Sequence, residues 1–184
     1  MRSKRRRTAA CLATAALAAA VVPVVSGTAI ADPAPLPPVV AEPVSPPPPT
    51  AEQIRHAQAE AMRRKLVLVA KSKIRTAHYA HGATGPRAFD CSGFTMWLYK
   101  TVAHRRLDHY SGAQLRETRR VSRKHLLPGD LLFWGPGGSQ HVSMYIGRGK
   151  MIGANNPRSG IRIESINAPW WQGKFAGAGR VIMA

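Results

Sequence analysis

One cysteine and one histidine lie where side chains commonly carry out nucleophilic chemistry. Cys91 follows Asp90 at the expected start of a helix, where unpaired amide groups and the helix dipole lower a thiol pKa. His141 begins an expected strand directly after a glycine-rich loop, which would hold its backbone while its ring reaches a cleft. A cysteine nucleophile needs such an imidazole to protonate a leaving amine. The pair indicates a Cys–His hydrolase, and a buried structural cysteine is the alternative.

The remaining histidines do not suggest a metal site. His78 and His81 lie close together before Cys91, but no further cysteine or acidic residue has ligand spacing. The others lie among charged residues and are expected on a solvated surface: His56, His104, His109 and His125. We therefore expect neither a metal nor a cofactor.

The first 31 residues are typical of a secretory signal peptide. Five basic residues precede an apolar run over 9–25, and Ala29-Ile30-Ala31 precedes Asp32. The run contains Pro23 and falls short of the ~20 residues that span a bilayer, which disfavours a retained anchor. Cleavage near Ala31 would remove Cys11 and deliver a chain with a lone thiol to the cell wall or the extracellular space. A lone thiol is a liability in an oxidising compartment unless it has a function.

Composition divides the rest of the chain into three parts. Residues 32–50 include nine prolines and are expected to form a polyproline-like linker. Residues 51–65 are expected to form a polar helical extension, which begins with a capping box at Thr50 and Gln53. A compact domain is then expected over 66–184.

Hydrophobic periodicity predicts the elements that would hold the two reactive residues. The first helix should continue through Arg75, and a second should carry an apolar stripe of Phe94, Trp97, Leu98 and Val102. Strands are expected at 131–134, 141–146, 150–155, 161–166 and 180–183. Helices followed by strands indicate an α+β fold with an antiparallel sheet.

Three ordered segments resemble the NlpC family of papain-like cysteine peptidases that act on bacterial cell walls. These segments are 79–94, 127–133 and 141–152. The resemblance implies a papain-like fold in which N-terminal helices pack on an antiparallel sheet of about five or six strands. It also implies hydrolysis of a peptidoglycan stem peptide, typically between D-Glu and diaminopimelate.

Residue by residue, the resemblance implies Cys91 as the nucleophile and His141 as the base. Tyr79 matches a tyrosine that could hydrogen-bond the oxyanion together with the Cys91 amide. Asp90 and Ser92 match residues at the subsite for the amino end of the peptide. Both could instead cap the helix, and the two interpretations are weighted equally.

The sequence departs from the family at Gly153. Members commonly carry a polar residue, often His, at this position, where it orients the catalytic imidazole. Asn155 is the nearest polar residue on the same face of the expected strand. We therefore predict that Asn155 orients His141, which requires the strand to curl toward His141 or to carry a bulge after Gly153. A water, a backbone carbonyl or Asn156 is the alternative.

Two other functions are compatible with these features. Gly153 suggests a wall-binding protein of the same fold with weak or no catalysis. A CHAP-type amidase is the other alternative, because it shares the sequence order of Cys followed by His. The leading hypothesis is a secreted, monomeric endopeptidase.

The strong positive charge points to an anionic partner. The chain holds 27 Lys and Arg against nine Asp and Glu, a net charge of +18. Seven basic residues gather between Cys91 and the first long strand: Arg105, Arg106, Arg116, Arg119, Arg120, Arg123 and Lys124. Export and the absence of a base-reading motif argue against nucleic acid. Anionic cell-wall polymers or the outer membrane surface are the expected partners, and a solvated face without a partner is the alternative.

Overall fold

In the described part of the chain, all three α-helices precede the strands of the main sheet, as the sequence predicts, and only a short strand pair lies between the first two helices. The computed structural model describes residues 46–184, so the expected signal peptide and most of the proline-rich linker lie outside the described residues. The helices are α1 (Ala51–Ser72), α2 (Cys91–Ala103) and α3 (Ser111–Glu117). No helix within 46–184 combines the length and hydrophobicity needed to cross a bilayer.

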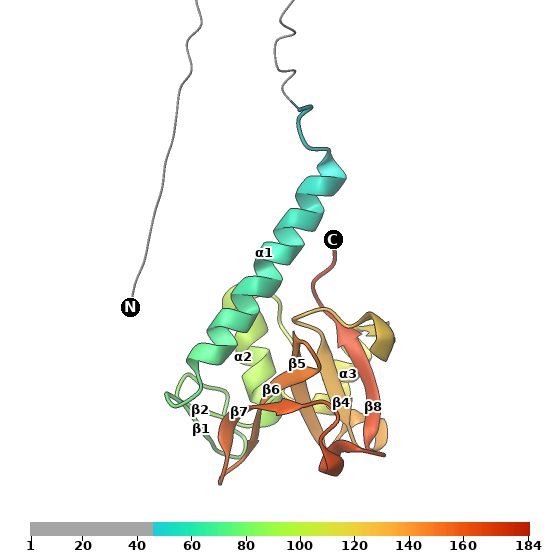
Figure 1. The fold of residues 1–184 in the computed structure, drawn as a ribbon. Coiled ribbons are helices and arrows are strands. Elements are labelled where there is room, and N and C mark those ends of the chain that lie inside the picture. The colour runs from blue at the N-terminus through green and yellow to red at the C-terminus, as the bar shows by residue number, and fades with distance from the viewer. Residues whose placement is uncertain (1–45) are drawn as a thin grey trace, which may run out of the picture. The chain divides into compact units, whose positions relative to one another are not determined.

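Helix α1 begins at the predicted capping box. The Thr50 hydroxyl accepts from the Gln53 amide, and the Gln53 side chain accepts from the Thr50 amide. Leu66 is fully buried, and Arg63 is also buried although it belongs to the polar first part of the helix. Figure 1 shows α1 alongside α2, with its N-terminal turns near the C-terminal segment of the chain.

Six antiparallel strands form the main sheet, in agreement with the expected α+β fold. The strands are β3 (Arg119–Val121), β4 (Leu131–Trp134), β5 (His141–Gly147), β6 (Lys150–Asn156), β7 (Gly160–Ser165) and β8 (Phe175–Arg180). Their order in the sheet is β3-β8-β4-β5-β6-β7. A separate parallel pair, β1 (His78–Tyr79) and β2 (Ala88–Phe89), precedes Cys91.

The strand predicted at 180–183 is wrong. The last strand, β8, ends at Arg180 and pairs with both β3 and β4. Its glycine- and alanine-rich sequence has low β-propensity, so only its pairing with distant strands selects the extended form. A side chain at Gly179 would collide with the Thr118 side chain, which explains why glycine is required there.

Apolar residues pack on both faces of the sheet. On the helical side, Phe133 and Val142 contact Phe94 and Leu98 of α2 in one cluster. On the other side, Leu132, Trp134, Met151 and Ala178 form a second cluster. Strand β4 is therefore buried on both faces, which explains its uninterrupted apolar sequence.

A buried carboxylate, that of Asp130, joins helix α1 to the sheet. It accepts two hydrogen bonds from Arg180 of β8, at 2.8 and 2.7 Å, and one from the Leu127 amide. Arg63 of α1 approaches it to 3.6 Å and donates to the Pro128 carbonyl. Removing one member of such a group leaves buried charges without a partner.

We expect Asp130→Ala to lower the free energy of unfolding by about 3–5 kcal/mol, because two guanidinium groups lose their shared anion. Urea unfolding followed by circular dichroism measures this change. Glu60→Ala is the matched control, because it removes the exposed Glu60–Arg64 pair, for which we expect a loss below ~0.5 kcal/mol. Equal losses in the two variants would contradict a structural role for Asp130.

Candidate active site

The backbone around Cys91 is fixed by the carboxylate of Asp90. Helix α2 begins at Cys91, as predicted, with Asp90 as its N-cap. The carboxylate accepts from the Gly93 amide at 2.7 Å and from the Ser92 hydroxyl at 3.1 Å. It also accepts from the Gly82 amide at 2.9 Å and contacts His109 Nε2 at 2.8 Å. Cys91 is thus held between the turn that precedes it and the helix that it begins.

Packing of α2 against β5 brings Cys91 to the first residues of β5. The backbone amide of Val142, which directly follows His141 in β5, lies close enough to the Cys91 thiol to act on its pKa. The amides of Ser92 and of Cys91 itself also face the sulfur. The start of α2, with Cys91, therefore lies against the start of β5, the strand that begins with His141.

Burial reverses the pKa that we predicted for Cys91. Desolvation is the largest influence and raises the pKa of the thiol, and the nearby Asp90 carboxylate raises it further. The backbone amides act in the opposite direction but are weaker. The expectation of a lowered pKa was wrong because it counted the helix terminus and omitted the desolvation of a mostly buried sulfur.

Burial also determines the charge of His141. Desolvation lowers the pKa of the imidazole to about 4, so that the ring is neutral at pH 7. Trp171, in the short helix Pro169–Trp171, stacks on the ring with 4.9 Å between centroids and 20° between planes. Glu164 holds Trp171 in turn, by accepting from its indole N–H at 2.8 Å.

The hydrogen bond of the His141 ring goes to Ser143. The distance from His141 Nε2 to Ser143 Oγ is 2.9 Å. Asn155, which we predicted as the orienting residue, has no hydrogen-bond partner for its buried Oδ1. The register of β6 with β7 does shift between Ala154 and Asn156, which supplies the predicted irregularity. Asn155 Oδ1 lies beside the same space as Ser143 Oγ, 3.1 Å from where a Cβ on Gly153 would stand, but it makes no hydrogen bond to the imidazole.

The other predicted site residues lie around Cys91. Tyr79 pairs with Phe89 across β1 and β2, just before Asp90, and burial together with Cys91 and Asp90 raises the pKa of its phenol. The phenol therefore keeps its proton at neutral pH and can donate. Asp90 and Ser92 are buried and bonded to each other and to the backbone, so their geometry favours the capping interpretation.

Sequence reasoning missed two residues that touch the imidazole. Ser143 could have been found, because it lies two positions after His141 in one strand and alternation places both on the same face. Trp171 gave no local signal, because its contact with His141 depends on how the segment between β7 and β8 folds back over the sheet.

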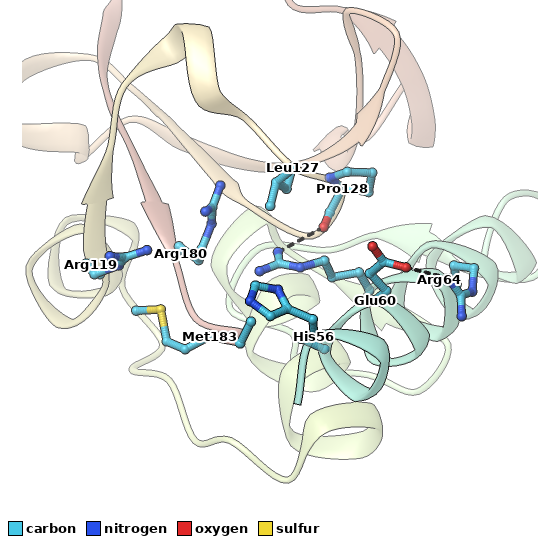
Figure 2. A pocket seen from close by; sticks show the side chains of 11 residues that line it. His56, Glu60, Arg64, Arg119, Leu127, Pro128, Arg180 and Met183 are labelled. Atoms are coloured by element: carbon cyan, nitrogen blue, oxygen red, sulfur yellow. Dashed lines mark hydrogen bonds and ion pairs between the residues drawn. The ribbon is translucent and has the colours of Figure 1, made fainter. Parts of the chain in front are cut away.

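A separate cavity of about 710 Å³ lies away from this site. Figure 2 shows His56 and Glu60 of α1 on one side of it, and Arg119, Arg180 and Met183 on the other. Its buried charges are paired within the protein, Arg63 and Arg180 with Asp130. Within 46–184, no three His, Cys, Asp or Glu side chains gather in a way that could hold a metal ion.

Comparison with known proteins agrees with this geometry. Residues 76–180, more than half of the chain, match the NlpC/P60 family. The chain belongs to this family. The match begins just before β1 and ends with β8, so it contains Cys91, His141 and all strands of the main sheet.

Individual relatives share this region of the chain. The probable endopeptidase p60 of Listeria monocytogenes is 39% identical over 104 residues, which are 56% of this chain and 21% of that protein. The murein DD-endopeptidase MepH of Escherichia coli is 37% identical over 112 residues, 56% of this chain and 41% of MepH. The chain therefore spans less than half the length of these relatives.

A solved structure has the same fold. The NlpC/p60 domain of the peptidoglycan hydrolase SagA is 33% identical, with a TM-score of 0.56. The similarity covers 65% of this chain and 98% of that domain.

We expect alkylation of Cys91 by iodoacetamide to follow an apparent pKa above the ~8.5 of a free cysteine, because desolvation disfavours the thiolate. Mass spectrometry of the Cys91 peptide, sampled over a pH series, gives the rate. A cysteine blocked at both ends, N-acetylcysteine N-methylamide, is the reference under the same conditions, because it has no carboxylate to raise its thiol pKa. Cys91→Ser supplies the blank. A midpoint below that of the reference would show that the amides outweigh burial.

Proposed function

We propose that this chain is a secreted cysteine endopeptidase that hydrolyses peptidoglycan stem peptides, with Cys91 as the nucleophile and His141 as the base. One observation supports this proposal most directly. The N-terminus of α2 packs against the first residues of β5, so that the Val142 amide lies beside the Cys91 thiol. The family match and relatives named as endopeptidases support the same reaction.

The resting charges define how the reaction would start. With the pKa of Cys91 raised and that of His141 lowered to about 4, both groups are neutral at pH 7. The thiol proton therefore passes to His141 as the sulfur attacks the carbonyl carbon of the substrate. His141 then protonates the leaving amine, and water hydrolyses the thioester with His141 again as base.

Two donors are placed to stabilise the oxyanion. The Cys91 amide lies at the N-terminus of α2, where it has no partner within the helix. Tyr79 lies beside the nucleophile, and its raised pKa keeps its phenol protonated and able to donate. Donors of this kind act where charge develops in the transition state.

The bond between D-Glu and diaminopimelate is the substrate that we propose. This choice of bond rests on the resemblance of three segments, around Cys91 and His141, to the NlpC family. The name of the relative MepH, a murein DD-endopeptidase, points to a different bond for that enzyme. Secretion is proposed from the basic and apolar sequence of residues 1–31.

We expect digestion of purified peptidoglycan fragments to yield peptides that begin with diaminopimelate and disaccharides whose stem ends in D-Glu. Mass spectrometry identifies both products, and Cys91→Ala should produce neither. Opened cross-links with intact D-Glu to diaminopimelate bonds would instead indicate DD cleavage. Release of whole stems from the sugar would indicate the amidase, and binding without products would indicate the wall-binding alternative.

We also propose that the basic residues between Cys91 and β4 attract anionic cell-wall polymers. All seven are exposed, and three of them lie on or next to the edge strand β3: Arg119, Arg120 and Arg123. Charges on such a surface act through a field that salt screens over ~8 Å at physiological ionic strength.

We expect co-sedimentation with purified walls to weaken as salt rises, and to weaken at low salt when Arg119, Arg120 and Arg123 are replaced by Glu. The matched control reverses Arg55, Lys65 and Lys71 of α1, which makes the same change in net charge at another place. Salt-insensitive binding, or equal losses in both triple variants, would contradict a localised polymer site.

A further inference from the structure

We propose that Ser143 is the positioning residue of the active site, and that it fixes the tautomer of His141 through Nε2. This inference rests on the proposed function, since it assigns a partner to the proposed base. The side chain of Ser143 is buried, with 1% of its surface exposed, and its Oγ lies 2.9 Å from Nε2. Such a contact is a hydrogen bond of ordinary length.

The position of Ser143 follows from the geometry of the sheet. His141 and Ser143 are two residues apart in β5, so their side chains leave the same face. Met144 pairs with Ile152 in the antiparallel ladder, which places Ser143 opposite Gly153 of β6. A Cβ atom on Gly153 would lie 3.0 Å from Ser143 Oγ and 3.4 Å from Ser143 Cβ. The serine thus occupies the space beside a position that lacks a side chain.

The hydrogen bond has a direct chemical consequence. A neutral imidazole carries one N–H, and the other nitrogen accepts. When Nε2–H donates to Ser143 Oγ, Nδ1 is unprotonated and free to take the thiol proton. The opposite tautomer would place a hydrogen on Nδ1 and prevent it from acting as a base.

Two further contacts restrict the ring. Trp171 stacks on its plane, which limits rotation out of that plane. The backbone of His141 is held in β5 opposite Trp134 of β4. Neither contact distinguishes the two ring nitrogens, whereas Ser143 binds Nε2 alone and leaves Nδ1 as the nitrogen without this partner. A hydroxyl can accept from Nε2–H or donate to an unprotonated Nε2, and the proposal commits to the first arrangement, which a measurement of the tautomer tests directly.

The first test measures the tautomer without substrate. In ¹⁵N NMR of the purified protein, assigned with His141→Ala, we expect wild type to show a protonated Nε2 and an unprotonated Nδ1. Ser143→Ala should give a mixture of the two tautomers, and Ser143→Thr should keep the wild-type pattern because it retains the hydroxyl. An unchanged pattern in Ser143→Ala would overturn the proposal.

The second test measures turnover on peptidoglycan fragments. We expect Ser143→Ala to lower kcat about tenfold, equivalent to ~1.4 kcal/mol, with little change in KM. Ser165→Ala is the matched control, since it also removes a partly buried strand serine whose Oγ accepts a hydrogen bond, there from the Asn167 amide. We expect its kcat to equal that of wild type. An equal loss in both variants would overturn the positioning role.

A relocated hydroxyl separates positioning from simple destabilisation. The double variant Ser143→Gly with Gly153→Ser moves the hydroxyl to the opposite strand, into the space that the two residues share. We expect it to regain most of the kcat and the single tautomer, even if Ser143→Ala fails to fold. Recovery of folding without recovery of the tautomer would overturn the proposal. If wild type cleaves no fragments, the proposed function fails, and the NMR result alone decides the role of Ser143.

Discussion

The position of Cys91, the proposed nucleophile, depends on one buried carboxylate, that of Asp90. Its oxygens bind the Gly82 turn, the first turn of α2 and His109 in the loop that follows the helix. Three segments that are separate in the sequence therefore meet at the residue next to Cys91. An N-cap usually contributes about 1 kcal/mol to a helix. Here it also sets the direction in which the thiol leaves the helix, and hence whether the sulfur can face β5.

Burial governs the electrostatics of the site more strongly than the helix terminus does. Burial removes water from both Cys91 and His141, which raises the pKa of the thiol and lowers the pKa of the imidazole. The site therefore rests as a neutral pair rather than as a separated thiolate and imidazolium. Charge would appear only when a substrate carbonyl is in place to receive it. The amides around the sulfur would then stabilise the developing anion, because a hydrogen bond to a charged group is stronger at the low dielectric of a buried site.

The elements that the sequence predicted well are those set by local patterns. The capping box of α1, the start of α2 after Asp90 and the strand that begins with His141 all depend on neighbouring residues. Strand β8 was misplaced because its glycine-rich sequence becomes extended only between β3 and β4. Trp171 was missed for the same reason, since a long-range fold places it on the imidazole. The thiol pKa was misjudged because the sequence reveals a helix terminus but not the depth of burial.

Gly153 departs from the family pattern, but the imidazole of His141 still has a hydrogen-bond partner, Ser143. By sequence alone, the missing side chain of Gly153 suggests weakened catalysis, and Asn155 is the substitute that the same strand offers. In a pleated sheet, however, the nearest volume to a missing side chain belongs to the residue directly across the ladder. Ser143 is that residue, and it lies on the face of His141 by simple alternation. Because opposite positions share one volume, a polar group can be supplied from either strand. The glycine alone is therefore no argument that the imidazole lacks a partner.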